Sequence, residues 1–263
     1  MKNPICRLWT ILAVAFITFF IVSACDGINI LGIELKPSAL YSSIIKLDSE
    51  SDTEISMIEE PDSPTETVIT FPQPTDTATK NILFIGDSML EGLYPRLAAY
   101  AENNGHTLNT VIWYSSTSQI WGECDTLSHF IKKYNSDYIF VCLGANELFV
   151  KDIKTKRAKY VEHIIAEIGS IPFVWIGPPN WKNDTGINDL LESKLPEGSF
   201  FLSNGMHFER SKDGAHPTRA SASLWMDSVV RWMPNKALHP IKLEIPTKKN
   251  ARANSVVILQ PKQ

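Results

Sequence analysis

The sequence contains few of the residues that build metal sites or disulfide frameworks. Among its 263 residues are 4 cysteines and 6 histidines, with no C-x-x-C pair and no histidine-rich cluster, so we expect no metal ion. The chain also lacks a strongly basic domain, and its formal net charge of -4 argues against a nucleic-acid partner. What remains is an ordinary globular balance of 44% hydrophobic and 21% charged residues, with room for one sizeable core.

The first residues, 1–24, have the pattern of a secretory signal. Lys2 and Arg7 precede an apolar run, residues 8–22, and small residues follow it directly before Cys25. This ending resembles the lipobox of bacterial lipoproteins, which implies that Cys25 is lipidated and becomes the first residue of the mature chain. We therefore expect a lipid-anchored protein of the cell envelope, whose folded part lies outside the cytoplasm and whose membrane contact is the N-terminal lipid. The alternative is an uncleaved membrane anchor, for which the apolar run is short.

Residues 25–79 are predicted to form a flexible acidic tether. They are dense in Asp, Glu, Ser, Thr and Pro, and such a segment buries too little apolar area to offset its ordering entropy. A folded domain follows at 80–233, and a basic, Pro-punctuated tail at 234–263. Within the domain, Cys142 lies in an apolar run and is expected to be a small core residue. A Cys124–Cys142 disulfide is compatible with the compartment, but spacing does not show it.

Apolar runs alternate with helical periodicity through the folded domain. This alternation predicts an α/β fold: a three-layer, flavodoxin-like doubly wound parallel sheet of about five strands in the order 2-1-3-4-5, with helices on both faces. An apolar run in the tail, 256–259, is a candidate edge strand. We expect strands at 82–85, 110–114, 138–143, 172–176 and 199–202, and helices at 89–103, 125–133, 155–168 and 217–232.

The first predicted strand ends abruptly at Gly86-Asp87-Ser88. Gly86 allows a tight turn, and Ser88 then falls where a helix begins, close to backbone N–H groups that lack helical partners. A serine in that place is a candidate nucleophile, with an oxyanion site beside it to which its own N–H contributes. The alternative is a turn followed by an N-capping serine.

Candidate partners of Ser88 come after later strands. In the order 2-1-3-4-5 the first and third strands flank the topological switch point, so Asn146, which follows the third strand, is expected to face Ser88 across the crevice. An Asn amide there can donate to a developing oxyanion. Asp213 and His216 lie three residues apart on a Gly-containing turn. The carboxylate would hold the imidazole and leave its other nitrogen to take a proton from Ser88. Each alone has an ordinary alternative, a turn aspartate and a surface histidine.

Together these blocks resemble the SGNH (GDSL-like) hydrolase superfamily, over residues 81–232. The resemblance implies a Ser-His-Asp mechanism without a cofactor, in which nucleophile, base and orienting carboxylate are Ser88, His216 and Asp213. It also implies Asn146 and the Ser88 N–H as oxyanion donors. The blocks are Gly86-Asp87-Ser88, Gly144-Ala145-Asn146-Glu147 and Asp213-Gly214-Ala215-His216-Pro217.

Two departures from the family pattern concern the site. The third block has Glu147 where the family usually has Asp, a form that resembles carbohydrate-directed branches. The second block lacks its usual Gly after the second strand, and the loop there contains Ser116, whose backbone N–H is the candidate for the same oxyanion role. The sequence has no Gly-x-Ser-x-Gly motif of an α/β-hydrolase elbow.

We therefore expect an extracytoplasmic serine esterase that hydrolyses small acyl esters, O-acetyl groups in particular, on an acylated glycan or a small ester substrate. Packing is the ordinary role of any single tryptophan, and Trp121, Trp181 and Trp225 are also candidates for a sugar-stacking cleft. His207 and Arg210 are candidates for substrate contact. The nearer alternative is an O-acyltransferase that acts on cell-envelope polysaccharide with the same residues. Others are a non-catalytic glycan-binding module and a flavodoxin-type binder, although the loop after the first strand lacks a phosphate-cradling Gly- and Thr-rich sequence.

Overall fold

The computed structural model describes residues 28–30, 33–35 and 70–260, and the chain divides into two compact units. In the smaller unit, β1 (Ile28–Ile30) and β2 (Ile33–Leu35) form an antiparallel pair. All the described residues from 70 onward belong to the larger unit. The predicted signal, the lipidation site Cys25 and most of the predicted tether lie outside the described residues. Among the described residues, no helix has both the length and the apolar character needed to cross a membrane.

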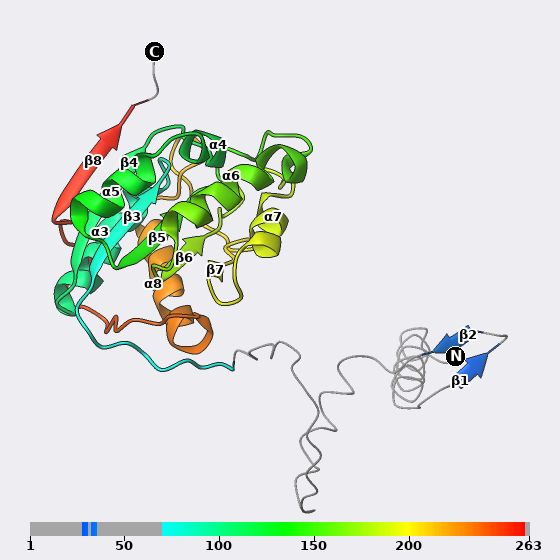
Figure 1. Cartoon of the computed structure of the whole chain (residues 1–263), viewed down its shortest axis with the longest axis horizontal. Helices are drawn as coiled ribbons and strands as arrows, with labels where there is room; N and C mark the ends of the chain where they lie inside the picture. Colours follow the sequence, from blue (N-terminus) through cyan, green and yellow to red (C-terminus); the bar gives the residue numbers. More distant parts are fainter. Residues whose placement is uncertain (1–27, 31–32, 36–69, 261–263) are drawn as a thin grey trace, which may run out of the picture. The chain divides into compact units, whose positions relative to one another are not determined.

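The larger unit is built on one sheet of six parallel strands (Figure 1). Their spatial order is β8-β4-β3-β5-β6-β7. Numbered within the domain, the first five have the predicted order 2-1-3-4-5, which is confirmed, and the apolar run in the tail adds β8 at the edge beside β4. The strands are β3 (Asn81–Gly86), β4 (Thr107–Trp113), β5 (Tyr138–Cys142), β6 (Phe173–Ile176), β7 (Phe200–Phe201) and β8 (Ser255–Leu259).

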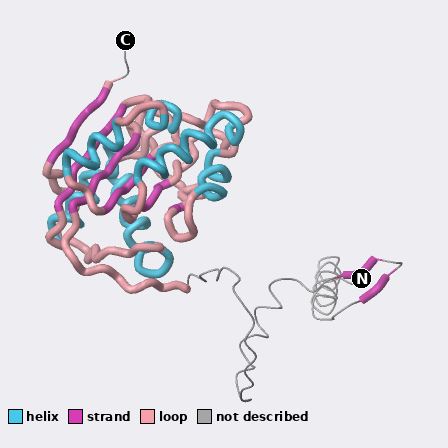
Figure 2. The backbone as a smooth tube through the Cα atoms, viewed as in Figure 1, coloured by secondary structure: helices cyan, strands magenta, loops and turns pink. Residues whose placement is uncertain are grey.

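The central strands are apolar on both faces because helices cover both faces. In β3, Ile82 and Phe84 belong to one hydrophobic core and Leu83 and Ile85 to the other. All four side chains are fully buried, which explains why this strand shows no polar alternation. The sheet is therefore the middle of three layers (Figure 2).

Two helices cover one face of the sheet, and four cover the other. Residues of α3 and α8 share one core with the sheet, and residues of α4, α5, α6 and α7 supply the second. This arrangement confirms the prediction of helices on both faces. The helices are α3 (Leu90–Asn103), α4 (Ser118–Gly122), α5 (Thr126–Tyr134), α6 (Ile153–Ile168), α7 (Ile187–Lys194) and α8 (Arg219–Lys236).

Several local features differ from the sequence-based expectation. Helices α4 and α7 are not predicted, because segments of five and eight residues are too short to show helical periodicity. The last helix begins later than expected, since the Thr218 side chain caps it by accepting the Ser221 N–H at 3.3 Å. Cys142 is buried, as expected for a core residue, and both it and Cys124 are free thiols.

The tail after α8 folds back over α3 before it reaches the edge of the sheet. Arg96 in α3 donates from Nη1 to the carbonyls of Lys248 and Lys249, each at 3.0 Å. The Ala251 N–H donates to the Pro95 carbonyl at 2.9 Å. The tail is thus fixed along α3 before it continues as β8.

Candidate active site

Ser88 lies at the carboxyl end of β3, in the short loop that leads into α3. A Cβ atom on Gly86 would lie 2.3 Å from the carbonyl oxygen of Cys142, so only glycine fits there. The Asp87 N–H donates to the same carbonyl at 3.2 Å, and Asp87 Oδ1 accepts the Met89 N–H at 2.9 Å. These contacts fix the loop at the switch point of the sheet, where the sequence places Ser88.

Asp213 and His216 are presented by a closed turn before α8. Arg210 and Pro217 form an antiparallel bridge across the base of the turn. Asp213 Oδ1 accepts the backbone N–H groups of Ala215 at 2.9 Å and His216 at 3.0 Å. Arg210 Nη1 donates to the Ala215 carbonyl at 2.6 Å. Arg210, a candidate for substrate contact in the sequence, therefore supports the turn.

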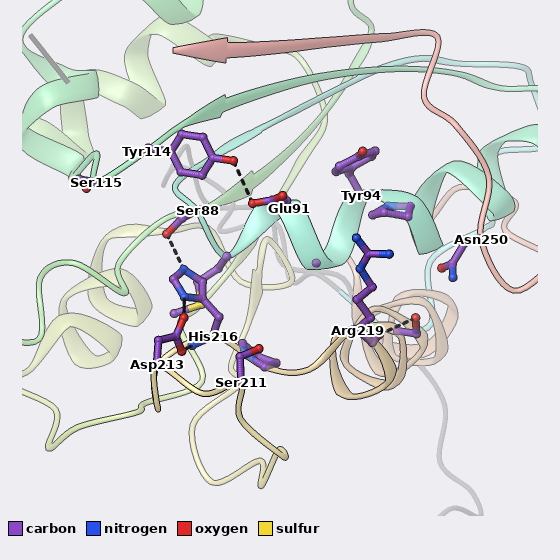
Figure 3. A pocket seen from close by; sticks show the side chains of 15 residues that line it. Ser88, Glu91, Tyr94, Tyr114, Ser115, Ser211, Asp213, His216, Arg219 and Asn250 are labelled. Carbon is purple, nitrogen blue, oxygen red and sulfur yellow. Dashed lines mark hydrogen bonds and ion pairs between the residues drawn. The ribbon is translucent and has the colours of Figure 1, made fainter. Parts of the chain in front are cut away.

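The turn meets Ser88 in a continuous hydrogen-bonded chain (Figure 3). Asp213 Oδ2 lies 2.7 Å from His216 Nδ1, and His216 Nε2 lies 2.8 Å from Ser88 Oγ. The pKa of Asp213 is lowered to about 2, first by the Ala215 N–H and then by the His216 side chain. The carboxylate is therefore ionised at neutral pH and only accepts, so the proton lies on Nδ1 and Nε2 can accept the Ser88 hydroxyl proton.

Asn146 lies on the loop after β5, as the sequence predicts. Its Nδ2 donates to the Ser116 carbonyl at 2.8 Å, which uses one of its two hydrogens. The Ser88 N–H has no hydrogen-bond partner among the described residues. Both groups therefore retain a donor for an oxyanion.

The structure corrects the prediction for Ser116. Its N–H donates to the Trp113 carbonyl at 3.1 Å, and its side chain is fully buried, so this amide is already committed to a turn. Ser115 lines the cavity instead. It has φ 57, a left-handed conformation that favours glycine, and within residues 70–260 its N–H has no partner. A Ser-Ser pair without glycine carries no sequence signal for which residue adopts this conformation.

Two buried carboxylates lie behind the candidate oxyanion donors. Burial, assisted by the nearby Glu147 carboxylate, raises the pKa of Asp87 to about 7. Burial also raises the pKa of Glu147. Glu147 Oε1 accepts from both the N–H and the hydroxyl of Ser118, so it joins the loop after β5 to the start of α4, where the loop after β4 ends. These are the loops that carry Asn146 and Ser115, a positioning role that the motif alone does not reveal.

A cavity of about 680 Å³ opens beside Ser88. It extends along α3 and is bounded on the other side by the Asp213–His216 turn, the start of α8 and the tail. Serine, tyrosine and asparagine side chains make up much of its wall. Its lining residues are Ser88, Met89, Glu91, Gly92, Tyr94, Pro95, Tyr114, Ser115, Ser211, Asp213, His216, Pro217, Arg219, Ser223 and Asn250.

Two of the three tryptophans have the packing role that the sequence favours for each of them. Trp121 and Trp225 are fully buried, so neither is available to stack on a sugar. Trp181 is partly buried, donates to the Ala145 carbonyl at 3.2 Å and packs edge-on against Phe149. His207 is exposed and does not line the cavity. In the part of the chain that the structure describes, no three His, Cys, Asp or Glu side chains gather as metal ligands would.

Comparison with known proteins finds similarity in solved structures only, since no family model and no curated protein matches the chain. An acetyl esterase variant with a bound acetate ion is 11% identical, with a TM-score of 0.42 over 57% of this chain and 96% of its own. A putative lipolytic protein of the G-D-S-L family from Desulfitobacterium hafniense is 14% identical, with a TM-score of 0.38 over 57% and 97%. The esterase EstA from Pseudoalteromonas is 17% identical, with a TM-score of 0.39 over 59% and 100%.

Proposed function

We propose that this chain is a serine hydrolase of the SGNH type that cleaves small acyl esters. The observation that carries the proposal is the chain of hydrogen bonds from Ser88 Oγ through His216 to Asp213, with distances of 2.8 and 2.7 Å. Ser88 meets two residues more than 120 positions farther along the chain, in the order that a nucleophile, a base and an orienting carboxylate require. The motif spacing that resembles the SGNH superfamily leads to the same three residues.

The geometry supports a two-step acyl transfer. Ser88 Oγ attacks the ester carbonyl while His216 Nε2 takes the hydroxyl proton, and the imidazolium then gives that proton to the departing alcohol. Water attacks the acyl-enzyme in the second step, again through His216. The negative charge on the tetrahedral oxygen would be met by the N–H groups of Ser88 and Ser115 and by the free hydrogen of Asn146 Nδ2.

The wall of the cavity supports a polar carrier for the acyl group. Hydroxyl and amide groups of Ser211, Ser223 and Asn250 line it, together with the rings of Tyr94 and Tyr114. Such groups suit a carbohydrate, whose hydroxyls exchange hydrogen bonds and whose ring faces pack on aromatics. We therefore propose O-acetyl groups on a glycan as the substrate.

The proposed location rests on the sequence alone. The secretory signal and the small residues before Cys25 support a lipid-anchored protein of the cell envelope. Cys25→Ser should abolish labelling of the chain by radioactive palmitate. Unchanged labelling would rule out Cys25 as the anchor.

The proposed activity is tested by modification and turnover of the same protein. A fluorophosphonate probe should label Ser88, as located by peptide mass spectrometry, and Ser88→Ala should lower the turnover of an acetyl ester by roughly three orders of magnitude or more. Ser228→Ala is the matched control, because Ser228 lies on α8 outside the cavity, and its hydroxyl donates to the Leu224 carbonyl and accepts from Arg231. Near-normal turnover in a folded Ser88→Ala protein would exclude this mechanism.

A further inference from the structure

We propose that the end of the cavity away from Ser88 binds an anionic group, a carboxylate or a phosphate, on the non-reacting part of the substrate, and that Arg219 is its main partner. This inference deepens the proposed function and rests on it. It assigns a role to Arg219 and to the tail, neither of which belongs to the catalytic motifs.

The cavity has a direction that follows α3. Ser88, Glu91 and Pro95 line it in that order, and the helix between Leu90 and Pro95 alone advances about 7.5 Å. Asn250 marks the end near Pro95, because the adjoining Ala251 N–H donates to the Pro95 carbonyl at 2.9 Å. In Figure 3, Arg219 rises from the start of α8 toward α3 on the side of Asn250, opposite Ser88 and Asp213.

The charged side chains of the cavity are separated along this direction. Glu91 and Asp213 lie toward Ser88, and both have partners: Glu91 Oε2 accepts from the Tyr114 hydroxyl at 2.9 Å, and Asp213 holds His216. The Arg219 side chain, by contrast, has no hydrogen bond or ion pair with any residue in the range 70–260. An anion close to Ser88 would be repelled by two carboxylates, whereas the Arg219 end offers an uncompensated positive charge.

The tail contributes Asn250 to the same end of the cavity. Arg96 fixes it by donating to the carbonyls of Lys248 and Lys249, and Asn250 then contributes its side chain to the wall. Among the described residues neither Lys249 nor Arg252 forms an ion pair. The sequence around Asn250 is therefore basic, which favours an anion over a cation in its neighbourhood.

The chemistry of these groups matches a planar or tetrahedral oxyanion. A guanidinium presents its N–H groups as a fixed fork that pairs with two oxygens of a carboxylate or a phosphate. The Asn250 amide and the Ser223 hydroxyl can donate beside it. The fitting substrate is thus an ester on a carrier that is neutral near the acyl group and negatively charged about one sugar unit away.

The test compares three carriers that bear the same acetyl group. Methyl 3-O-acetyl-glucuronoside, its neutral uronamide and methyl 3-O-acetyl-glucoside 6-phosphate are given to the full chain, and kcat/KM is measured from released acetate. We expect one or both anionic carriers to be preferred over the uronamide by about tenfold at low salt, and the preference to shrink in about 0.5 M NaCl. In Arg219→Gln the preference should fall to about one. The anionic carrier that is preferred by the wild type and no longer preferred by Arg219→Gln identifies the group that Arg219 binds.

The matched control is Arg231→Gln, which removes an exposed arginine from the same helix, about 18 Å farther along its axis; it should keep both the turnover and the preference. Equal turnover of all three carriers by the wild type, or a preference that survives Arg219→Gln, would overturn the inference while leaving the esterase intact. If no carrier releases acetate and the fluorophosphonate does not label Ser88, the proposed function fails instead. Binding of the deacetylated glucuronoside and uronamide to wild type and Arg219→Gln then decides the anion site by itself.

Discussion

Asp87 and Asp213 both lie close to Ser88, but their carboxyl groups have opposite environments. Asp87 is 0% exposed, and burial raises its pKa to about 7. The Asp213 side chain is 49% exposed, and hydrogen bonds from the Ala215 N–H and from His216 lower its pKa to about 2. A carboxyl group that is buried with few hydrogen-bond donors favours its neutral form, because its charge is not solvated. A carboxyl group that is exposed and accepts several hydrogen bonds stays charged. The charged one contacts the imidazole, and the buried one holds the backbone of the nucleophile loop.

The largest effect should come from neutralising the exposed aspartate. Asp213→Asn removes the charge that holds His216 Nδ1–H and allows the wrong tautomer, so we expect kcat for an acetyl ester to fall by about 10³–10⁴. The thermal midpoint should fall only slightly, because the charge that is lost is exposed and the amide oxygen of Asn can still accept the Ala215 and His216 N–H groups. Asp189→Asn on α7, which removes another exposed carboxylate, is the control. A folded Asp213→Asn protein with more than about a tenth of normal kcat would contradict the assigned role.

Part of the fold and of the candidate site can be predicted from the sequence. Strand order follows from alternating apolar runs, and the sheet order brings Ser88 and Asn146 to one edge because the carboxyl ends of parallel strands lie together. The Asp213–His216 contact follows from three-residue spacing on a turn. These features depend on local sequence patterns or on the order of the strands, so they can be predicted from the sequence.

Features that depend on packing are not predicted. Which amide of the Ser115-Ser116 pair stays free depends on one φ angle, since both residues have the same side chain. The burial of Trp121 and the Glu147–Ser118 contact depend on how α4 packs, and α4 has too few residues to show periodicity. The course of the tail over α3 depends on Arg96 and on backbone carbonyls that carry no side-chain signal.

The next effect concerns stability at the buried aspartate. Its folded pKa of about 7 lies above the ordinary value of 3.8, so between these values the folded protein holds the proton more tightly than the unfolded chain does. The free energy of unfolding should therefore decrease as pH rises from about 4 to about 7, by an amount on the order of a few kcal/mol, and level off above that. The raised pKa of Glu147 acts in the same direction. Asp213, with its lowered pKa, stabilises above about pH 4 and loses that contribution as pH falls toward 2.

Asp87→Asn mimics the protonated carboxyl and keeps an oxygen for the Met89 N–H. It should flatten the decrease between pH 4 and 7, as measured by urea unfolding at several pH values. In Asp189→Asn the pH profile should match the wild type. A profile in Asp87→Asn as steep as that of the wild type would show that another group binds the proton.

The smallest effect on turnover should come from substituting Ser115, whose backbone N–H takes the oxyanion role predicted for Ser116. Ser115→Gly keeps the backbone N–H and suits φ 57, so kcat should stay within about threefold of the wild type. Ser115→Val places a β-branched residue in a conformation that it avoids, which should displace the amide and lower kcat more. Asn146→Ala gives the reference on the same acetyl ester, with an expected loss of about 10²–10³ for a removed oxyanion donor. Ser116→Ala should instead reduce stability, because the Ser116 hydroxyl accepts the indole N–H of buried Trp121 at 3.0 Å. If Ser115→Gly were as damaging as Asn146→Ala, the Ser115 hydroxyl, and not its amide, would be the group that meets the substrate.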